Sequence, residues 1–339
     1  MALKVVLDAA GGDLAPVETV KGAVEAARLH GLPLLLVGPE ASVRAELAKY
    51  DTTGLDLEVV DAPEIVGMEE HPVAAVRSKK RSSMNVGMGL VRDGKAQAFV
   101  SAGNSGAAFA AGLFILGRIE GVERPALAGI YPTLAGPMLL LDIGANADVR
   151  PQHLRQFALL GSAYVERALG RSNPRVALLS NGEEETKGNA VVQEAHRLLR
   201  ESNLNFVGNV EGRDLPTGTK ADVVVCDGFV GNVAVKLSEG LSETLFSLIR
   251  AEIGRGIVSK IAAAALMPAF RRIKARLDYE EYGGAPLLGV KGVVIIAHGR
   301  SKAKAIRNAL RVAAQAADQR LVETIAEGLA AHTEEMGSV

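Results

Sequence analysis

The chain alternates short apolar runs with amphipathic stretches, and this alternation limits its fold more than any other feature. Apolar runs at 4–8, 32–37 and 55–60 are separated by helical patterns that begin near Pro16 and at 39–49. Short apolar runs indicate strands, and apolar spacing near 3.6 residues indicates helices. A strand–helix–strand–helix–strand order predicts a parallel sheet with right-handed crossovers.

Composition agrees with an α/β enzyme. The 339 residues are 48% hydrophobic and include 37 glycines, which suits many tight turns between strands and helices. This length allows one large α/β unit, with or without two lobes. We find no internal repeat, linker or composition break, so we predict a single catalytic unit over 1–334 rather than two independent domains.

Charge and cysteine content exclude several classes of protein. The formal net charge is −1, so no global field attracts nucleic acid, and an anionic partner must meet a local basic patch. Cys226 is the only cysteine, which excludes disulfides within one chain and points to a reducing cytoplasm. The first residues lack a signal-peptide layout, and no apolar run reaches the roughly 18 residues that span a bilayer. We therefore expect a soluble or peripheral protein.

Polar, glycine-containing turns connect predicted strands to the helices that follow them. Such turns lie at 9–13, 101–108, 181–189 and 226–232. Ligands of open α/β sheets bind at the carboxyl ends of strands, so we expect these turns to meet along one edge if the strands are parallel neighbours. Gly11-Gly12 lacks the G-x-G-x-x-G spacing, so we predict no dinucleotide site there.

The turn at 181–189 combines three successive glutamates with one lysine, Lys187. A lysine at the start of a helix can neutralise a bound phosphate or a developing oxyanion. Alternatively, the glutamates offset the helix dipole and Lys187 is a solvated surface charge. The turn at 101–108 also has two interpretations. Its small residues would let backbone N–H groups approach an anion closely, or they would simply allow a tight turn.

The stretch 253–277 has a different character. Leu266, Phe270, Ile273 and Leu277 are spaced as one helical stripe, and four basic residues lie off it. A basic amphipathic helix is typical of a surface for membrane or an acidic partner. The alternative is a helix packed on the core or on a second subunit.

Several longer motifs follow one another in a fixed order, at 8–13, 101–107, 140–146, 182–189, 226–233, 282–289 and 298–301. Together they resemble the phosphate acyltransferases of bacterial phospholipid synthesis, the PlsX family. Two departures are mild: Ala10 stands where the family usually has Met, and Ser105 where Thr is usual.

The resemblance implies transfer of a fatty acyl group from acyl-[acyl carrier protein] to inorganic phosphate, without a cofactor. It also implies a three-layer αβα sandwich with a mostly parallel sheet, like that of isocitrate and isopropylmalate dehydrogenases, with 253–277 projecting from it. A homodimer is implied as well, associated peripherally with the inner face of the cell membrane. There the acyl phosphate would serve the membrane glycerol-3-phosphate acyltransferase.

The chemistry of this reaction needs little from the protein. A thioester is already activated and phosphate is itself the nucleophile, so no Ser or Cys nucleophile is required, and the sequence has no G-x-S-x-G elbow. We expect Lys187 and Asn232 to act in catalysis, Lys187 on phosphate and the tetrahedral oxyanion, and Asn232 as a donor. His298 is a weaker candidate for protonating the leaving thiolate. We predict no metal ligands.

Two further groups of residues follow from these patterns. For substrate binding we predict Asp8, Gly11, Gly12, Asp13, Gly103, Asn104, Ser105, Gly106, Asn146, Glu184, Asp227, Gly228, Gly231 and His298. For contact with membrane or carrier protein we predict Ile257, Ile261, Leu266, Phe270, Arg271, Arg272 and Lys274.

Two other functions remain open. One is a phosphotransacetylase-type enzyme that uses acyl-CoA. The other is a non-catalytic scaffold that docks acyl carrier protein to membrane through the basic helix. A dehydrogenase of the related fold would need an aspartate cluster for metal and a nucleotide pocket, and we find neither assembled.

Overall fold

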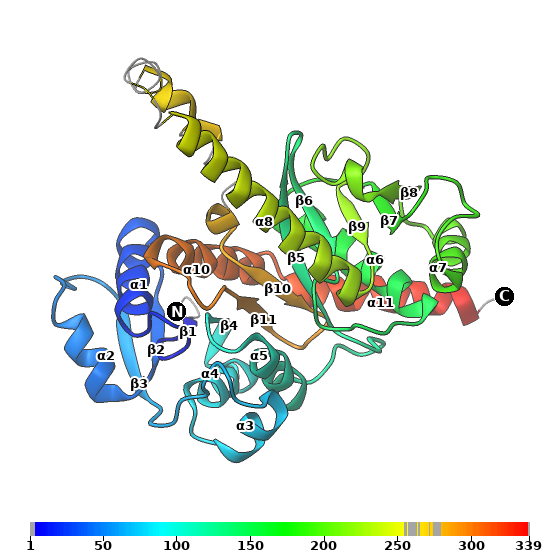
Figure 1. Cartoon of the computed structure of the whole chain (residues 1–339). Coiled ribbons are helices and arrows are strands. Elements are labelled where there is room, and N and C mark those ends of the chain that lie inside the picture. Colours follow the sequence, from blue (N-terminus) through cyan, green and yellow to red (C-terminus); the bar gives the residue numbers. More distant parts are fainter. Residues whose placement is uncertain are drawn as a thin grey trace.

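The computed structural model describes residues 4–253 and 279–337, with 256, 263, 265–270 and 272–273 between them. Eleven strands form one sheet in the order β3-β2-β1-β4-β11-β10-β5-β6-β9-β7-β8. Helices cover both faces of this sheet, and α8 projects away from the rest (Figure 1). The predicted mostly parallel sheet flanked by helices is thereby confirmed.

The first part of the chain builds one end of the sheet. Its helices and strands are β1 (Lys4–Asp8), α1 (Val17–His30), β2 (Leu34–Gly38), α2 (Glu40–Leu47), β3 (Leu57–Asp61), α3 (Pro72–Ser78), α4 (Ser83–Arg92), β4 (Ala96–Ser101), α5 (Ser105–Ala111) and the π-helical η1 (Gly112–Leu116).

The rest of the chain builds the other end of the sheet, and its last two strands, β10 and β11, then lie between β4 and β5. Its helices and strands are β5 (Ala126–Thr133), β6 (Gly136–Leu141), α6 (Pro151–Ala168), β7 (Val176–Ser180), α7 (Ala190–Arg200), β8 (Phe206–Glu211), η2 (Gly212–Asp214), β9 (Val223–Val225), α8 (Gly228–Ile253), η3 (Tyr279–Tyr282), β10 (Ala285–Leu288), β11 (Val293–Ile296), α10 (Ala303–Asp318) and α11 (Leu321–Gly337).

The two ends of the sheet run in opposite directions. β4 is parallel to β1 and β11, whereas β10 is antiparallel to both β11 and β5, and β5 is antiparallel to β6. β6, β9, β7 and β8 are then parallel to one another. The expectation that all the polar turns meet at one edge is therefore wrong. Turns 9–13 and 101–108 lie at the carboxyl ends of one set, and turns 181–189 and 226–232 at those of the other.

Alternate residues of each strand enter different core layers. Val5 and Leu7 pack with α1, α6 and α10 on one face, while Val6 packs with α4 and α5 on the other. At the far end Leu139 and Leu141 join the first layer, and Leu140 joins a third cluster with residues of α8. This separation makes a three-layer structure.

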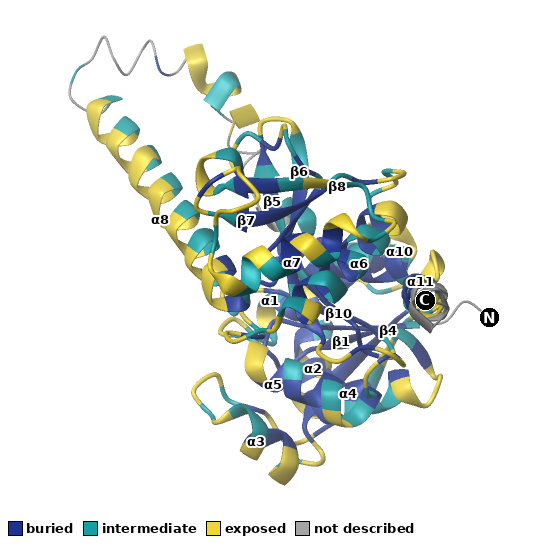
Figure 2. Ribbon diagram, turned by 90° about the vertical axis from the view of Figure 1, so that its right-hand side faces the viewer, coloured by how far each residue is buried: buried dark blue, intermediate teal, exposed yellow. Residues whose placement is uncertain are grey.

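The helix α8 is largely uncovered. Within its 26 residues only Gly228 and Gly231 are buried, and Figure 2 shows it exposed along most of its length. Of the stretch 253–277, the predicted contacts Ile257, Ile261, Arg271 and Lys274 lie outside the described residues. Where the chain is described, none of its helices combines the length and apolar content needed to cross a membrane.

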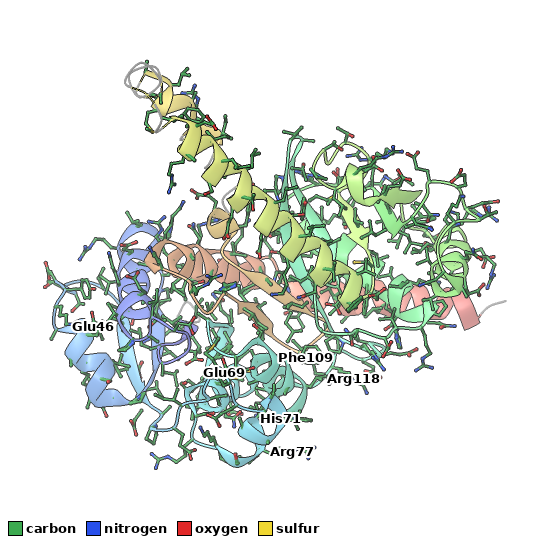
Figure 3. The ribbon with its side chains drawn as sticks, viewed as in Figure 1. Glu46, Glu69, His71, Arg77, Phe109 and Arg118 are labelled. Atoms are coloured by element: carbon green, nitrogen blue, oxygen red, sulfur yellow. The ribbon has the colours of Figure 1, made fainter. Side chains whose placement is uncertain are left out.

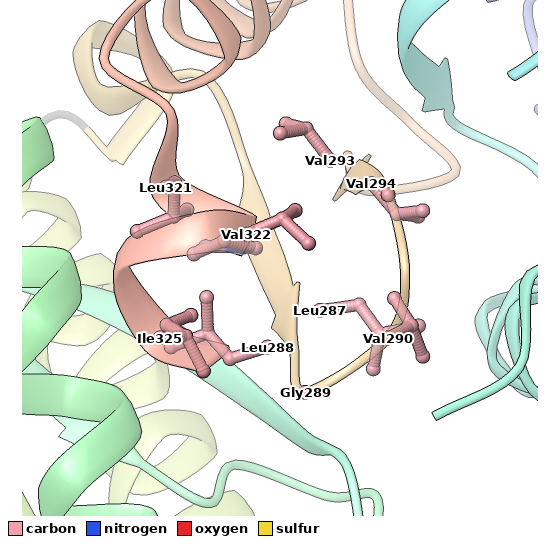
Figure 4. Close-up of a pocket in the computed structure, with 11 residues that line it drawn as sticks. Leu287, Leu288, Gly289, Val290, Val293, Val294, Leu321, Val322 and Ile325 are labelled. Atoms are coloured by element: carbon pink, nitrogen blue, oxygen red, sulfur yellow. The ribbon is translucent and has the colours of Figure 1, made fainter. Parts of the chain in front are cut away.

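Two local features differ from expectation. We predict one long helix from about 302 to 331, but the chain breaks between α10 and α11, where Arg320 has a φ of 55°. A small apolar cavity lies between this second helix and the hairpin of β10 and β11 (Figure 4). Leu321, Val322 and Ile325 close it from the helix side, and no charged residue lines it.

Candidate functional site

The turn after β6 is organised by one buried carboxylate, Asp142. Its Oδ1 accepts hydrogen bonds from the backbone N–H groups of Leu127, Gly144 and Ala145 at 3.0–3.2 Å. Its Oδ2 accepts from Asn146 twice, from the backbone N–H at 2.7 Å and from Nδ2 at 2.8 Å. Burial raises the pKa of Asp142 against the opposing effect of these donors. Five donors on one carboxylate fix the shape of this turn.

The start of α8 packs directly on the Asp142 turn. Gly228 N–H donates to the carbonyl of Asn146 at 2.7 Å, and Asn232 Nδ2 donates to the carbonyl of Ile143 at 3.0 Å. A side chain at Gly231 would overlap the carbonyl of Asp142, so only glycine allows this approach. The structure thus brings together four predicted residues, Asn146, Gly228, Gly231 and Asn232.

The amides at the start of α8 are already engaged. Asp227 Oδ1 accepts from Val230 N–H at 2.8 Å and its carbonyl accepts from Gly231 N–H at 3.0 Å. Asp227 therefore caps the helix. The Gly228 and Val230 amides each have one N–H, which is used within the protein, whereas Asn232 Nδ2 carries two and gives one to the Ile143 carbonyl.

Cys226 lies beneath the same turn. Its side chain is 4% exposed, and its Sγ lies 3.5 Å from the carbonyl oxygen of Asp142. Burial raises the pKa of the Cys226 thiol well above its usual range, and the carboxylates of Asp227 and Asp142 add to this. A thiol without a nearby cation stays protonated, so it is a poor nucleophile.

Two of the three glutamates before Lys187 are paired with other cations. Glu183 Oε1 lies 2.7 Å from Lys220 Nζ, and Glu185 Oε2 lies 2.7 Å from Arg200 Nη1. Lys187 is exposed, and its ammonium forms no ion pair or side-chain hydrogen bond with any residue that the structure describes. The turn thus leaves one lysine free to meet an anion.

Glu184, the third glutamate, holds the backbone of the same turn through its main chain. Its carbonyl accepts hydrogen bonds from Asn209 Nδ2 at 2.9 Å and from Lys187 N–H at 3.0 Å. The Lys187 side chain packs against Gly182, where a Cβ would come within 2.6 Å of its Cγ. These contacts fix the backbone of the turn, and the ammonium extends beyond them.

Three carboxylates beside this turn are close enough to share a metal ion. The ligand oxygens of Glu183, Glu211 and Asp214 lie within 4.8 Å of one another. Lys220 Nζ lies 3.0 Å from Asp214 Oδ2, and Arg213 Nε lies 2.5 Å from Glu211 Oε2. The two cations offset the negative charge that would attract a metal, so the cluster is built as an ion-pair network.

The opposite edge of the sheet holds the second group of predicted residues. Asp8 is 1% exposed and its Oδ2 accepts from Ser101 Oγ at 2.7 Å. Ser101 Oγ in turn accepts from Gly103 N–H at 3.0 Å. Burial raises the pKa of Asp8. Gly11 and Gly103 lie directly against this carboxylate, so it helps to position the two turns.

Asn104 links this edge to a neighbouring loop. Its Oδ1 accepts from Ala107 N–H at 3.0 Å and caps α5, while its Nδ2 donates to the carbonyls of Met68 at 2.9 Å and Glu70 at 3.1 Å. Both ends of the side chain have partners within the protein. Ser105 and Gly106, the next residues, are exposed.

The third turn at this edge follows β11. Asp13 N–H donates to the carbonyl of Gly299 at 2.9 Å, next to Gly12, whose φ is 113°. His298 is exposed, and its Nδ1 accepts from Arg300 N–H at 3.2 Å. Two groups of predicted residues therefore lie at opposite edges of the sheet. One edge holds Lys187 and Asn232, and the other holds Asp8, Gly11, Gly12, Asp13, Gly103, Asn104 and His298.

Two features of the site were missed by the sequence analysis. Asp142 is the centre of its turn, and the signal for it was a strand-ending aspartate before Gly-Ala-Asn within 140–146. The cations that neutralise the glutamates, Lys220 and Arg200, come from distant segments that sequence spacing does not place.

The fold is similar to those of several solved structures. A phosphotransacetylase from Staphylococcus aureus superposes with a TM-score of 0.61 at 18% identity, covering 93% of this chain and 94% of that one. A 4-hydroxythreonine-4-phosphate dehydrogenase from Klebsiella pneumoniae gives a TM-score of 0.55 at 13% identity, covering 93% and 99%. At these identities the likeness establishes the fold alone, an open α/β fold that phosphotransacetylases and 4-hydroxythreonine-4-phosphate dehydrogenases also have.

Sequence comparison is more specific. Residues 3–324 match the family described as fatty acid synthesis protein. A phosphate acyltransferase from Pelotomaculum thermopropionicum is 53% identical over 323 residues, covering 95% of this chain and 94% of the relative. Another from Trichlorobacter lovleyi is 50% identical over 327 residues, covering 96% and 94%. The chain belongs to this phosphate acyltransferase family and is an acyltransferase enzyme, as its resemblance implies.

Proposed function

We propose that this enzyme transfers a fatty acyl group from acyl-[acyl carrier protein] to inorganic phosphate, giving acyl phosphate for phospholipid synthesis. Membership of the phosphate acyltransferase family supports the reaction class. The observation that carries the site is the pairing of Glu183 with Lys220 and of Glu185 with Arg200. This pairing leaves Lys187 as the cation available to an anionic substrate.

In the proposed reaction a phosphate oxygen attacks the thioester carbonyl carbon. A tetrahedral intermediate forms, the carbon–sulfur bond then breaks, and the thiolate takes a proton to leave as free carrier protein. Lys187 would bind phosphate and offset the negative charge of the intermediate, which a preorganised cation stabilises more than it does the substrate. Asn232 Nδ2 would donate to the same oxygen, held by the packing of α8 on the Asp142 turn.

The acyl donor is tested by comparing two thioesters of equal chain length. With acyl-[acyl carrier protein], we expect release of free thiol that requires phosphate and is saturable in both substrates. Acyl-CoA should be a poorer donor if the enzyme recognises the carrier protein. Preference for acyl-CoA would instead favour a phosphotransacetylase-type reaction, and no phosphate-dependent thiol from either donor would favour a scaffold.

We also propose that the enzyme works as a homodimer through α8. Leu237, Leu241, Leu245 and Leu248 are each between 55% and 68% exposed along this helix. A contiguous apolar face of this kind is larger than a monomer surface usually carries, and a second copy would cover it. Sedimentation should give a dimer, and replacing Leu237 and Leu241 with Glu should give monomers.

Finally, we propose peripheral association with the inner face of the cell membrane through the stretch 253–277. Leu266 is 55% exposed and Ile273 is 49% exposed, and Arg272 beside them is exposed. Apolar residues flanked by cations bind anionic lipid surfaces. This placement would deliver acyl phosphate to the membrane glycerol-3-phosphate acyltransferase.

A further inference from the structure

We propose that the acidic carrier protein docks on a basic patch formed by Arg77, Phe114, Arg118 and Lys291, called here the Arg118 patch. This inference rests on the proposed function, because it assigns a surface to the proposed acyl donor. The patch is separate from 253–277, where the sequence predicted a contact with membrane or carrier protein.

An exposed aromatic residue stands at the centre of the patch. Phe114, in the π-helical η1, is 51% exposed. The guanidinium carbon of Arg77, near the end of α3, lies 5.2 Å from the centre of its ring. The ring therefore holds a cation at the surface without neutralising it. Aromatic residues, phenylalanine among them, and arginine are enriched at protein–protein interfaces.

Backbone pairing brings Lys291 beside the segment Gly117–Arg118, which directly follows η1. Arg118 forms an antiparallel bridge with Val290, and Lys291 N–H donates to the carbonyl of Gly117 at 2.9 Å. Both side chains are exposed. Figure 3 shows Arg77 and Arg118 at the outer surface of the same half of the molecule.

The charge of the patch is not cancelled locally. Arg77, Arg118 and Lys291 form no ion pair with any residue in the described ranges; Arg118 Nη1 donates to the backbone carbonyl of Glu123 at 2.5 Å. The Glu123 carboxylate lies 3.0 Å from His153 Nε2 and 3.6 Å from Arg150 Nη2.

The acidic residues near the patch do not reverse its positive charge. Asp93 is paired with Arg92 at 2.8 Å, and Glu120 is exposed next to the patch. The three exposed cations give this surface a local positive charge, although the whole chain carries a formal charge of −1. Such a local patch selects an acidic protein surface and speeds its encounter.

The chain connects the patch to the Asp142 turn. The segment that follows Arg118 leads to Pro125, whose carbonyl accepts from Asn146 Nδ2 at 2.8 Å. Val290 and Lys291 follow β10, whose carboxyl end shares an edge with those of β6, β9 and β7. A carrier protein seated here would lie at the edge that holds Lys187 and Asn232.

The test is a charge-reversed triple variant, Arg77→Glu, Arg118→Glu and Lys291→Glu. With acyl-[acyl carrier protein] as donor we expect KM to rise about 10–100-fold because steering is lost, while kcat stays within about twofold. The wild-type kcat/KM should fall with salt, and this salt dependence should weaken in the variant. The matched control is Lys21→Glu, an exposed lysine on α1, which should change neither value.

Direct binding separates this inference from the proposed reaction. Titration with free carrier protein should give weaker binding to the triple variant and to Phe114→Ser than to wild type, with circular dichroism showing that both variants are folded. If the wild type turns over acyl-[acyl carrier protein] but the variants keep its KM and binding, the patch is not the docking surface. If the variants instead lose dimerisation or vesicle binding alone, the patch serves a second copy or a membrane and the inference is wrong.

Discussion

Asp142 and Asn146 are joined by two hydrogen bonds to the same carboxylate oxygen, one from the Asn146 backbone at 2.7 Å and one from its side chain at 2.8 Å. The carbonyl of Asn146 then accepts from Gly228 N–H, the first residue of α8. This relay sets where α8 begins, and therefore where Asn232 lies. The buried carboxylate of Asp142 thus positions Asn232, the donor in the proposed reaction.

Replacing this carboxylate tests the relay. In Asp142→Asn, one carboxylate oxygen is replaced by an NH₂ group, which cannot accept a hydrogen bond. Whichever oxygen is replaced, at least two N–H groups that bond it in the wild type lose their acceptor. Each such loss costs about 1–3 kcal/mol, and we expect a clear drop in the free energy of unfolding measured by urea. The matched change Asp148→Asn, at an exposed position of the same loop, should have little effect. Equal stability of Asp142→Asn and wild type would contradict the proposed role.

The strand and helix pattern of this chain was largely predictable because its apolar runs are short and strongly periodic. The direction of the strands was not. The hairpins formed by β5 with β6 and by β10 with β11 reverse the chain twice, and apolar runs look the same in parallel and antiparallel strands. The error placed Asp8 and Lys187 at one edge, whereas the sheet separates them.

The candidate site was only partly predictable for a related reason. Gly228, Gly231 and Asn232 were identified because glycine and polar residues directly after a strand are typical of a ligand-binding turn in an α/β sheet. Asp142 was not, because its importance comes from five donors that converge only in three dimensions. The release of Lys187 from its glutamates likewise depends on Lys220 and Arg200, which are distant in sequence.

The buried Asp8 predicts a pH dependence of stability. Its pKa is raised above its ordinary value of 3.8 by burial, so the folded state binds its proton more tightly than the unfolded state. The stability from this proton is present below the unfolded pKa and is lost as pH rises through the folded pKa. We therefore expect Asp8→Asn to gain stability relative to wild type as pH rises from about 4 to 7.

The control for Asp8 has the opposite sign. The pKa of the exposed Asp51 is lowered, chiefly by the backbone N–H of Thr53, so the stability it contributes is lost as pH falls. Asp51→Asn should thus lose stability relative to wild type as pH rises towards neutral. Unfolding by urea across this range measures both trends. A constant difference between Asp8→Asn and wild type would contradict a raised pKa.

Cys226 should be dispensable for chemistry. Its thiol is buried and its pKa is raised, so it does not form the thiolate that attacks a thioester or reacts with alkylating reagents. We expect Cys226→Ser to keep kcat within about threefold and wild type to resist modest doses of iodoacetamide and of chelators. Trapping of an acyl group on Cys226, seen by mass spectrometry, would overturn this prediction.

The stretch 253–277 should mediate reversible binding to anionic vesicles. Replacing Leu266 and Phe270 with Glu removes apolar contact and adds repulsion from anionic lipid, so the variant should stay in the supernatant when vesicles are sedimented. Wild-type binding should weaken with salt because exposed charges are screened. Acyl transfer in solution and the dimer should be unchanged. A variant that unfolds or becomes monomeric would show that these residues are core or interface.

The role of Lys187 is the central claim. Lys187→Ala should lower kcat by about 10²–10³, because one preorganised charge is lost at a developing oxyanion. Lys187→Arg should restore activity only in part, since a planar guanidinium replaces a compact ammonium. The control Lys236→Ala removes another exposed lysine, on α8, and should keep wild-type activity.

The most direct measurement follows the phosphorus atom. Wild-type enzyme is incubated with acyl-[acyl carrier protein] and phosphate, and ³¹P NMR detects acyl phosphate while a thiol reagent counts the released carrier protein. We predict one acyl phosphate for each thiol with wild type, and neither product above background with Lys187→Ala. Thiol release without acyl phosphate, or undiminished acyl phosphate formation by Lys187→Ala, would contradict the account.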